Sequence, residues 1–242
     1  MTKMLHLTLL SLLLTSCAAK TIDSSKLQKV DNVGIVSVLD DQASVKYSGT
    51  TIFTNKEFAA NTSPLSVNKL IVDEIHSELS SLQKKSLNVT LDMKKINEGK
   101  KEALSLKNIY LGNRYQTIQQ YVLEEAAKQG AEYVFVVHPT IHDGFPMHKS
   151  GYGFLCQSPL GRKGDLEVYF LVGAELWNVK TKEIEARATV TPEQVAIKTG
   201  KTCEEAAKMS PDKVAALYKE QLANLAKKSA DLILIGTGIS KK

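Results

Sequence analysis

The densest group of metal-ligating side chains in the sequence is the segment that holds His138, His142 and Asp143, with His148 a few residues further on. On an extended segment His138 and His142 point to the same side, and Asp143 adds a carboxylate nearby. Two imidazoles with an oxygen ligand suit zinc or copper, but this spacing matches no zinc signature such as His-Glu-x-x-His on a helix. His138 and His142 are therefore a candidate metal site. The alternative is a strand end whose histidines lie at the mouth of a loop, and we otherwise expect no cofactor.

Cys156 and Cys203 are the second group that could perform chemistry. In an oxidising compartment two cysteines favour a disulfide. Thr202-Cys203-Glu204-Glu205 also matches a helix-starting capping box, and a helix start lowers the pKa of a free thiol. Paired with a nearby histidine, such a thiol could act as a nucleophile. A disulfide between Cys156 and Cys203 is the favoured interpretation, while two unreactive thiols or a catalytic thiol stay open.

Residues 140–165 form a stretch of 26 residues rich in glycine and proline, which predicts a long loop. Loops of this length are uncommon and are usually functional or mobile. Tyr152 and Phe154 on such a loop are typical aromatic anchors for a protein partner, with His142 and Asp143 beside them. The predicted partner-binding loop therefore contains His142, Asp143, Tyr152 and Phe154. The alternative is that both aromatic side chains fold back onto the domain.

The N-terminus has the pattern of an export signal. Lys3 precedes a leucine-rich stretch that is too short to span a bilayer, and this stretch ends in Leu14-Thr15-Ser16-Cys17. These four residues resemble the bacterial lipobox, which implies cleavage before Cys17 and lipidation of its thiol and its new amine. More than one palmitate-type acyl chain would then be attached, which gives stable anchoring to the membrane. Ala18 after the cysteine favours the outer membrane, so we expect a lipoprotein that faces the periplasm.

The remaining sequence predicts one domain. We expect a signal peptide over residues 1–16, a lipidated N-terminus and polar tether over 17–31, and a single periplasmic domain over 32–242. The formal charge of +5 comes almost entirely from dispersed lysines, because the only arginines are Arg114, Arg162 and Arg187. Lysine lacks the planar fork that reads bases, so we expect no nucleic-acid partner. Lys20, Lys26 and Lys29 would attract anionic lipid headgroups beside the anchor.

The hydrophobic pattern predicts an α/β or α+β fold with a mixed β-sheet flanked by amphipathic helices. We expect helices from Ser63-Pro64 to residue 84, from Asn113 to Gly130, and from Ser210-Pro211 to Gly236. The expected strands are 33–39, 43–47, 50–54, 87–91, 133–137, 166–179 and 183–190, of which the last two form a late antiparallel hairpin.

These elements resemble a broad group of bacterial envelope lipoproteins whose domains are similar to the N-terminal domain of TolB and to the α/β domain of CsgG. The residues that carry the resemblance are Val33–Leu39, Ala131–Pro139, Leu166–Val190, the segment Ser48-Gly49-Thr50-Thr51-Ile52-Phe53, and Gly151-Tyr152-Gly153-Phe154. The resemblance implies protein binding rather than catalysis. We therefore expect a lipid-anchored, non-enzymatic binding or scaffold module with an envelope protein as partner. The alternatives are a metal- or thiol-dependent envelope enzyme, and an oligomeric secretion-associated lipoprotein.

Overall fold

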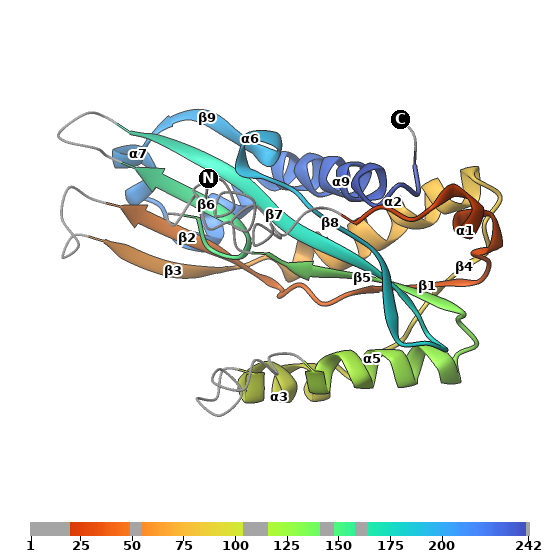
Figure 1. Cartoon of the computed structure of the whole chain (residues 1–242). Helices are drawn as coiled ribbons and strands as arrows, with labels where there is room; N and C mark the ends of the chain where they lie inside the picture. Colours follow the sequence, from red (N-terminus) through yellow and green to blue (C-terminus); the bar gives the residue numbers. More distant parts are fainter. Residues whose placement is uncertain (1–19, 49–54, 104–115, 141–147, 158–163, 241–242) are drawn as a thin grey trace, which may run out of the picture.

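The computed structural model describes residues 20–48, 55–103, 116–140, 148–157 and 164–240 (Figure 1). The strands are β1 (Val33–Ser37), β2 (Gln42–Ser48), β3 (Lys56–Asn61), β4 (Ser86–Asn88), β5 (Tyr133–Pro139), β6 (Gly151–Gln157), β7 (Asp165–Asn178), β8 (Glu183–Thr189) and β9 (Ala196–Thr202). The α-helices are α1 (Ser24–Lys29), α2 (Val67–Ser81), α3 (Met93–Ala103), α5 (Gln116–Lys128), α6 (Pro192–Val195), α7 (Cys203–Ala207), α8 (Pro211–Leu217) and α9 (Lys219–Gly236), and η2 (Ser63–Leu65) is a 3-10 turn.

The long strand β7 joins two halves of a mixed sheet whose order is β3-β2-β6-β7-β5-β1-β4. The first half of β7 pairs antiparallel with β6 on one side and β9 on the other. Its second half pairs antiparallel with β5 on one side and with β8 on the other. Since β1 runs parallel to both β4 and β5, and β2 runs parallel to β6, the sheet is mixed, which confirms the expected fold class.

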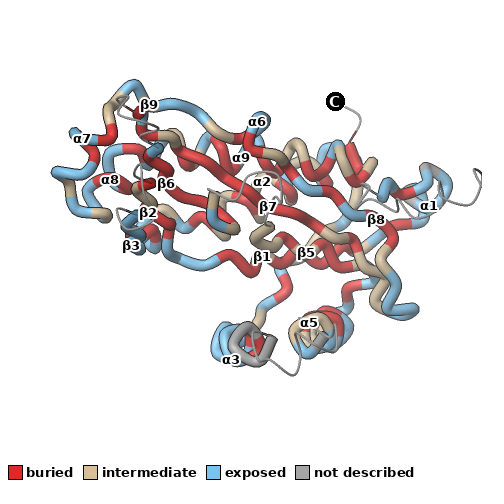
Figure 2. The backbone as a smooth tube through the Cα atoms, turned by 60° about the vertical axis from the view of Figure 1, so that its left-hand side comes forward, coloured by how far each residue is buried: buried red, intermediate tan, exposed pale blue. Residues whose placement is uncertain are grey.

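Helices cover the two faces of the sheet in separate layers. Figure 1 shows α2 and α9 on one face and the pair α3 and α5 on the other. The larger core lies between the sheet and α2 with α9, and it includes Ile71, Ile75 and Ile233. The smaller core lies under α5 and includes Val122 and Val134. Figure 2 shows the buried strands sandwiched between these layers.

Two predicted helices match the structure in their buried faces. Helix α2 buries Ile71, Ile75 and Leu79 at the expected spacing, although Leu82 lies just past its end and is 38% exposed. Helix α5 ends before Gly130, whose φ of +84° is the left-handed conformation that glycine adopts without strain. The expected cap Asn113 lies outside the described residues.

Other boundaries differ because local signals compete with tertiary packing. Ser63-Pro64 starts the 3-10 turn η2, and α2 follows only from Val67. The expected C-terminal helix is two helices, α8 and α9, which meet at Tyr218. The partner of β2 is β3, while the strand expected over residues 50–54 lies outside the described residues. Strand β9 was not expected at all, because its lysines and threonines alternate with only one large apolar side chain, Ile197.

The expected loop over residues 140–165 is wrong for residues 151–157, which form β6 in the middle of the sheet. Glycine allows this strand to approach its neighbour closely, because a Cβ on Gly153 would lie 2.1 Å from the Ser44 carbonyl oxygen on β2. Gly153 therefore marks close contact between strands rather than a flexible loop.

The expected tether over residues 17–31 is wrong for residues 20–31, which belong to the folded domain. Lys20 and Arg187 exchange two backbone hydrogen bonds of 2.9 and 2.7 Å, so the segment continues the sheet beyond β8. Ile22 is 6% exposed and its N–H donates to the Thr237 carbonyl at 2.9 Å. After α1, Val30 is also buried in the core. Apolar side chains spaced among polar ones anchor this segment.

Candidate functional site

Tyr152 and Phe154, the expected anchors of a partner-binding loop, are core residues of β6. Phe154 is fully buried, and its ring centroid lies 6.2 Å from that of Tyr218. Tyr152 is 3% exposed and stacks on Phe170 at 5.1 Å. Its hydroxyl donates to the Asp40 carbonyl at 2.6 Å and also lies 2.7 Å from the Thr62 hydroxyl. Both side chains fold back onto the domain, so neither is available to a partner.

Burial keeps the two tyrosines at this part of the sheet protonated. Desolvation raises the pKa of Tyr152 to about 12, against a weaker opposing effect of the hydrogen bond with Thr62. Desolvation likewise raises the pKa of Tyr169 on β7 to about 12. Both phenols are therefore protonated near neutral pH.

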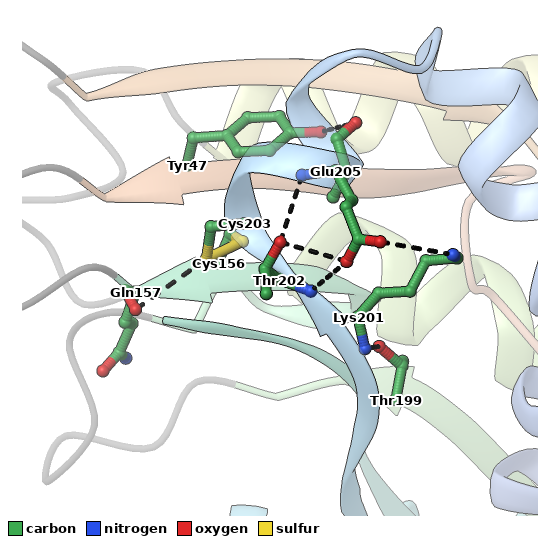
Figure 3. The surroundings of a disulfide bond; sticks show 9 residues. Tyr47, Cys156, Gln157, Thr199, Lys201, Thr202, Cys203 and Glu205 are labelled. Atoms are coloured by element: carbon green, nitrogen blue, oxygen red, sulfur yellow. Dashed lines mark hydrogen bonds and ion pairs between the residues drawn. A yellow bond between two sulfur atoms is a disulfide. The ribbon is translucent and has the colours of Figure 1, made fainter. Parts of the chain in front are cut away.

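Cys156 and Cys203 form a disulfide that ties the end of β6 to the start of α7 (Figure 3). Their Cα atoms lie 5.5 Å apart, within the ordinary range for a bridge. The capping box expected at Thr202 positions Cys203. The Thr202 hydroxyl accepts from the Glu205 N–H, and the Glu205 carboxylate accepts from the Thr202 N–H at 2.9 Å. These bonds lower the pKa of Glu205, which keeps its carboxylate charged.

The disulfide leaves no thiol for nucleophilic catalysis at either cysteine. Cys156 is 1% exposed and Cys203 is 9% exposed, so the bridge itself is also shielded from solvent. Figure 3 shows Tyr47 over the same corner, and its hydroxyl donates to the Ala206 carbonyl at 3.0 Å. The surroundings therefore match a covalent brace between strand and helix, and they give no support to a cysteine–histidine catalytic pair.

The histidines expected to bind metal do not converge in the part of the chain that the structure describes. His138 lies at the end of β5, where its Nδ1 atom is 3.2 Å from the Pro139 carbonyl oxygen. The Nε2 atom of His148 lies 2.6 Å from the Glu167 carboxylate, and its ring meets Tyr169 edge-on at 4.8 Å. His142 and Asp143 lie outside the described residues. Among the described residues, no three metal-ligating side chains of the His, Cys, Asp and Glu types come together.

The surface feature that the sequence interpretation missed is the edge strand β3. One side of β3 pairs antiparallel with β2, and within the described ranges no strand pairs with its other side. All its side chains except that of Ala60 are exposed, including Phe58 at 45%. An unpaired strand edge offers backbone donors and acceptors to another strand. The sequence signal for this edge is weak, because Ala59 between Phe58 and Ala60 breaks the alternation of apolar and polar residues.

The fold defines an α/β protein with a mixed sheet between two helical layers. Within the described residues, no helix combines the length and apolar character needed to cross a membrane. No protein-family model matches the chain, and no curated protein matches it significantly.

Three solved structures are similar to the chain over most of its length. A variant PelC dodecamer from Paraburkholderia phytofirmans is 10% identical with a TM-score of 0.35, covering 91% of this chain and 94% of that one. The DUF330 protein XCC0632 from Xanthomonas campestris is 10% identical with a TM-score of 0.39, covering 87% and 86%. The LpoB C-terminal domain from Salmonella enterica is 12% identical with a TM-score of 0.24, covering 72% and 92%. Because the TM-scores and the sequence identities are low, the similarity supports no functional conclusion.

Proposed function

We propose that this chain is a lipid-anchored envelope protein that binds another envelope protein and performs no catalysis of its own. The observation that carries the anchoring is Leu14-Thr15-Ser16-Cys17 at the end of a charged and leucine-rich leader. The disulfide between Cys156 and Cys203 supports export, because such bonds persist in oxidising compartments. Ala18 favours delivery to the outer membrane, with the domain in the periplasm.

Replacement of Cys17 tests the anchor. We expect a Cys17→Ala variant expressed in a bacterium to incorporate no clickable fatty-acid analogue and to leave the membrane fraction, because the acceptor thiol is gone. The control is Cys203→Ala, which lacks a cysteine outside the lipobox and should be labelled like the wild type. Labelling that persists in Cys17→Ala would refute the lipobox assignment.

We infer that the partner binds at the outer edge of β3, which replaces the expected loop as the contact surface. The partner we propose is a protein segment in extended conformation that adds a strand to this edge. Backbone hydrogen bonds would supply affinity, and the exposed ring of Phe58 would supply an apolar anchor. The ring already lies edge-on to Tyr47, with the centroids 6.3 Å apart, so little side-chain freedom is lost on binding.

A photo-crosslinking amino acid placed at Phe58 tests this surface in living cells. We expect it to yield one discrete crosslinked protein that is absent when the probe replaces Met93. Met93 is a matched control, because it is 42% exposed at the start of α3 and lies on no strand edge. Identical crosslinks at both positions, or crosslinks only at Met93, would place the partner elsewhere.

The alternative of a metal- or thiol-dependent enzyme has no specific support in the described part of the molecule, where the cysteines are paired and no metal-ligating group of three occurs. The third hypothesis is an oligomeric secretion-associated lipoprotein. Measuring the mass of the delipidated protein in solution distinguishes it from the first, because an oligomer would have a multiple of the mass of one chain.

A further inference from the structure

The N-terminal segment is attached to one particular edge of the domain. The backbone of Lys20 bridges to Arg187 on β8, and the Ile22 N–H donates to the carbonyl of Thr237 at the end of α9. Gly238, with a φ of +77°, turns the chain there, and a Cβ on it would lie 3.4 Å from the Ile22 carbonyl oxygen. Residues 20–22 are thus held on both sides, by β8 and by the end of α9.

This attachment limits the distance between a lipid on Cys17 and the domain. Cys17 and Lys20 are three residues apart, so their Cα atoms can be separated by at most about 11 Å even in a fully extended chain. The limit rests on the proposed function, since it matters only if Cys17 carries the lipid. A tether of the expected length, from 17 to 31, would instead allow about 50 Å and any orientation.

We propose that the surface made by residues 20–29, the outer edge of β8 and the end of α9 lies against the bilayer, and we call this surface the anchor face. The short connection holds it there, whereas the edge of β3 faces away from the membrane. On one side of β7, β6 connects it to β2 and then to β3, whereas β8 pairs with β7 on the other side. Strands β3 and β8 therefore lie on opposite sides of β7. Figure 1 shows α1 and β3 towards opposite ends of the molecule.

The charges on the anchor face suit a surface of anionic phosphates. Two of its carboxylates, those of Asp23 and Glu185, are engaged within the protein, while Glu183 at the start of β8 is exposed. Glu185 pairs with Lys26 at 2.8 Å and its side chain is only 10% exposed. Asp23 accepts from the Ser25 N–H at 2.7 Å, and these hydrogen bonds lower the pKa of its carboxyl. Lys29 is exposed, and no acid among the described residues pairs with it. Lysines this close to a membrane are attracted to anionic headgroups.

Site-specific quenching in vesicles tests the orientation. The full-length lipidated protein is reconstituted into vesicles of phosphatidylethanolamine and phosphatidylglycerol that contain a headgroup spin-labelled lipid. A thiol-reactive fluorophore is attached at Thr21→Cys on the anchor face or at Lys56→Cys on β3, both of which are exposed positions. Non-reducing conditions leave the Cys156–Cys203 bridge intact. We expect at least threefold stronger quenching at position 21 than at position 56, and equal quenching at both would overturn the proposal.

A linker variant tests the cause. Insertion of twelve Gly and Ser residues between Ala19 and Lys20 extends the mean reach to about 20 Å, so the quenching at position 21 should fall towards that at position 56. Undiminished quenching would show that the short connection does not set the orientation. Flotation of the same samples separates the two proposals. Protein that does not float with the vesicles contradicts the lipid anchor, while protein that floats with equal quenching contradicts only the orientation.

Discussion

Replacing Phe154 by alanine is expected to lower the free energy of unfolding by about 3–5 kcal/mol, because it empties a fully buried aromatic site in the central strand β6. The ring packs between the sheet and Tyr218, so neither the strand nor the helix pair α8 and α9 can easily fill the space. A domain of this size is stabilised by only about 5–15 kcal/mol, so the loss is a large fraction of the total. Urea denaturation of the purified domain, followed by circular dichroism, measures it.

Phe58→Ala is the matched control, because it removes the same side chain from an exposed position on β3. We expect it to cost about 1 kcal/mol, mostly from the lost contact with Tyr47. Partner binding should respond in the opposite sense: with the photo-crosslinking amino acid placed at Lys56 on β3 instead, Phe58→Ala should weaken the crosslink, and Phe154→Ala should affect it only through unfolding. Similar stability losses in the two variants would contradict the burial that the structure assigns to Phe154.

Reduction of the Cys156–Cys203 bridge is expected to cost about 4 kcal/mol, because the bond closes a loop of 47 residues in the unfolded chain. For a domain of this size the melting temperature should fall by roughly 10 °C. The bridge ties α7 to β6 at a corner that also contains the Tyr47 hydroxyl bond to Ala206 and the Cys203 N–H bond to Gly164.

Thermal unfolding with and without reductant measures this effect, and a Cys156→Ser/Cys203→Ser variant provides its control. The double variant should melt at the temperature of the reduced wild type and should not respond to reductant. If reductant lowered the melting temperature of the double variant as well, the loss would arise elsewhere in the protein. An unchanged melting temperature of the reduced wild type would show that the bridge contributes little to stability.

Local patterns predicted several elements well. The spacing of Ile71, Ile75 and Leu79 predicts the buried face of α2, and the Thr202 capping box predicts the start of α7. The favoured disulfide corresponds to the pairing in the structure. These features depend on side chains within a few residues of one another, or on there being only two suitable cysteines. The prediction that Tyr152 and Phe154 lie exposed on a partner-binding loop was wrong, because it was inferred from composition, without knowledge of what packs on these two side chains.

By itself, the sequence determined the fold class, the helix caps at Thr202 and Ser210 and the buried faces of the helices, since short-range geometry produces these. It also contains Leu14-Thr15-Ser16-Cys17, which resembles a lipobox and lies outside the described residues. Only the tertiary structure decided that residues 151–157 form a strand, because β2 and β7 supply the hydrogen bonds and Gly153 permits the contact. The same holds for Lys20 and Ile22, which join the domain through the distant residues Arg187 and Thr237. Contacts between residues so far apart in the chain leave no periodic pattern in either segment.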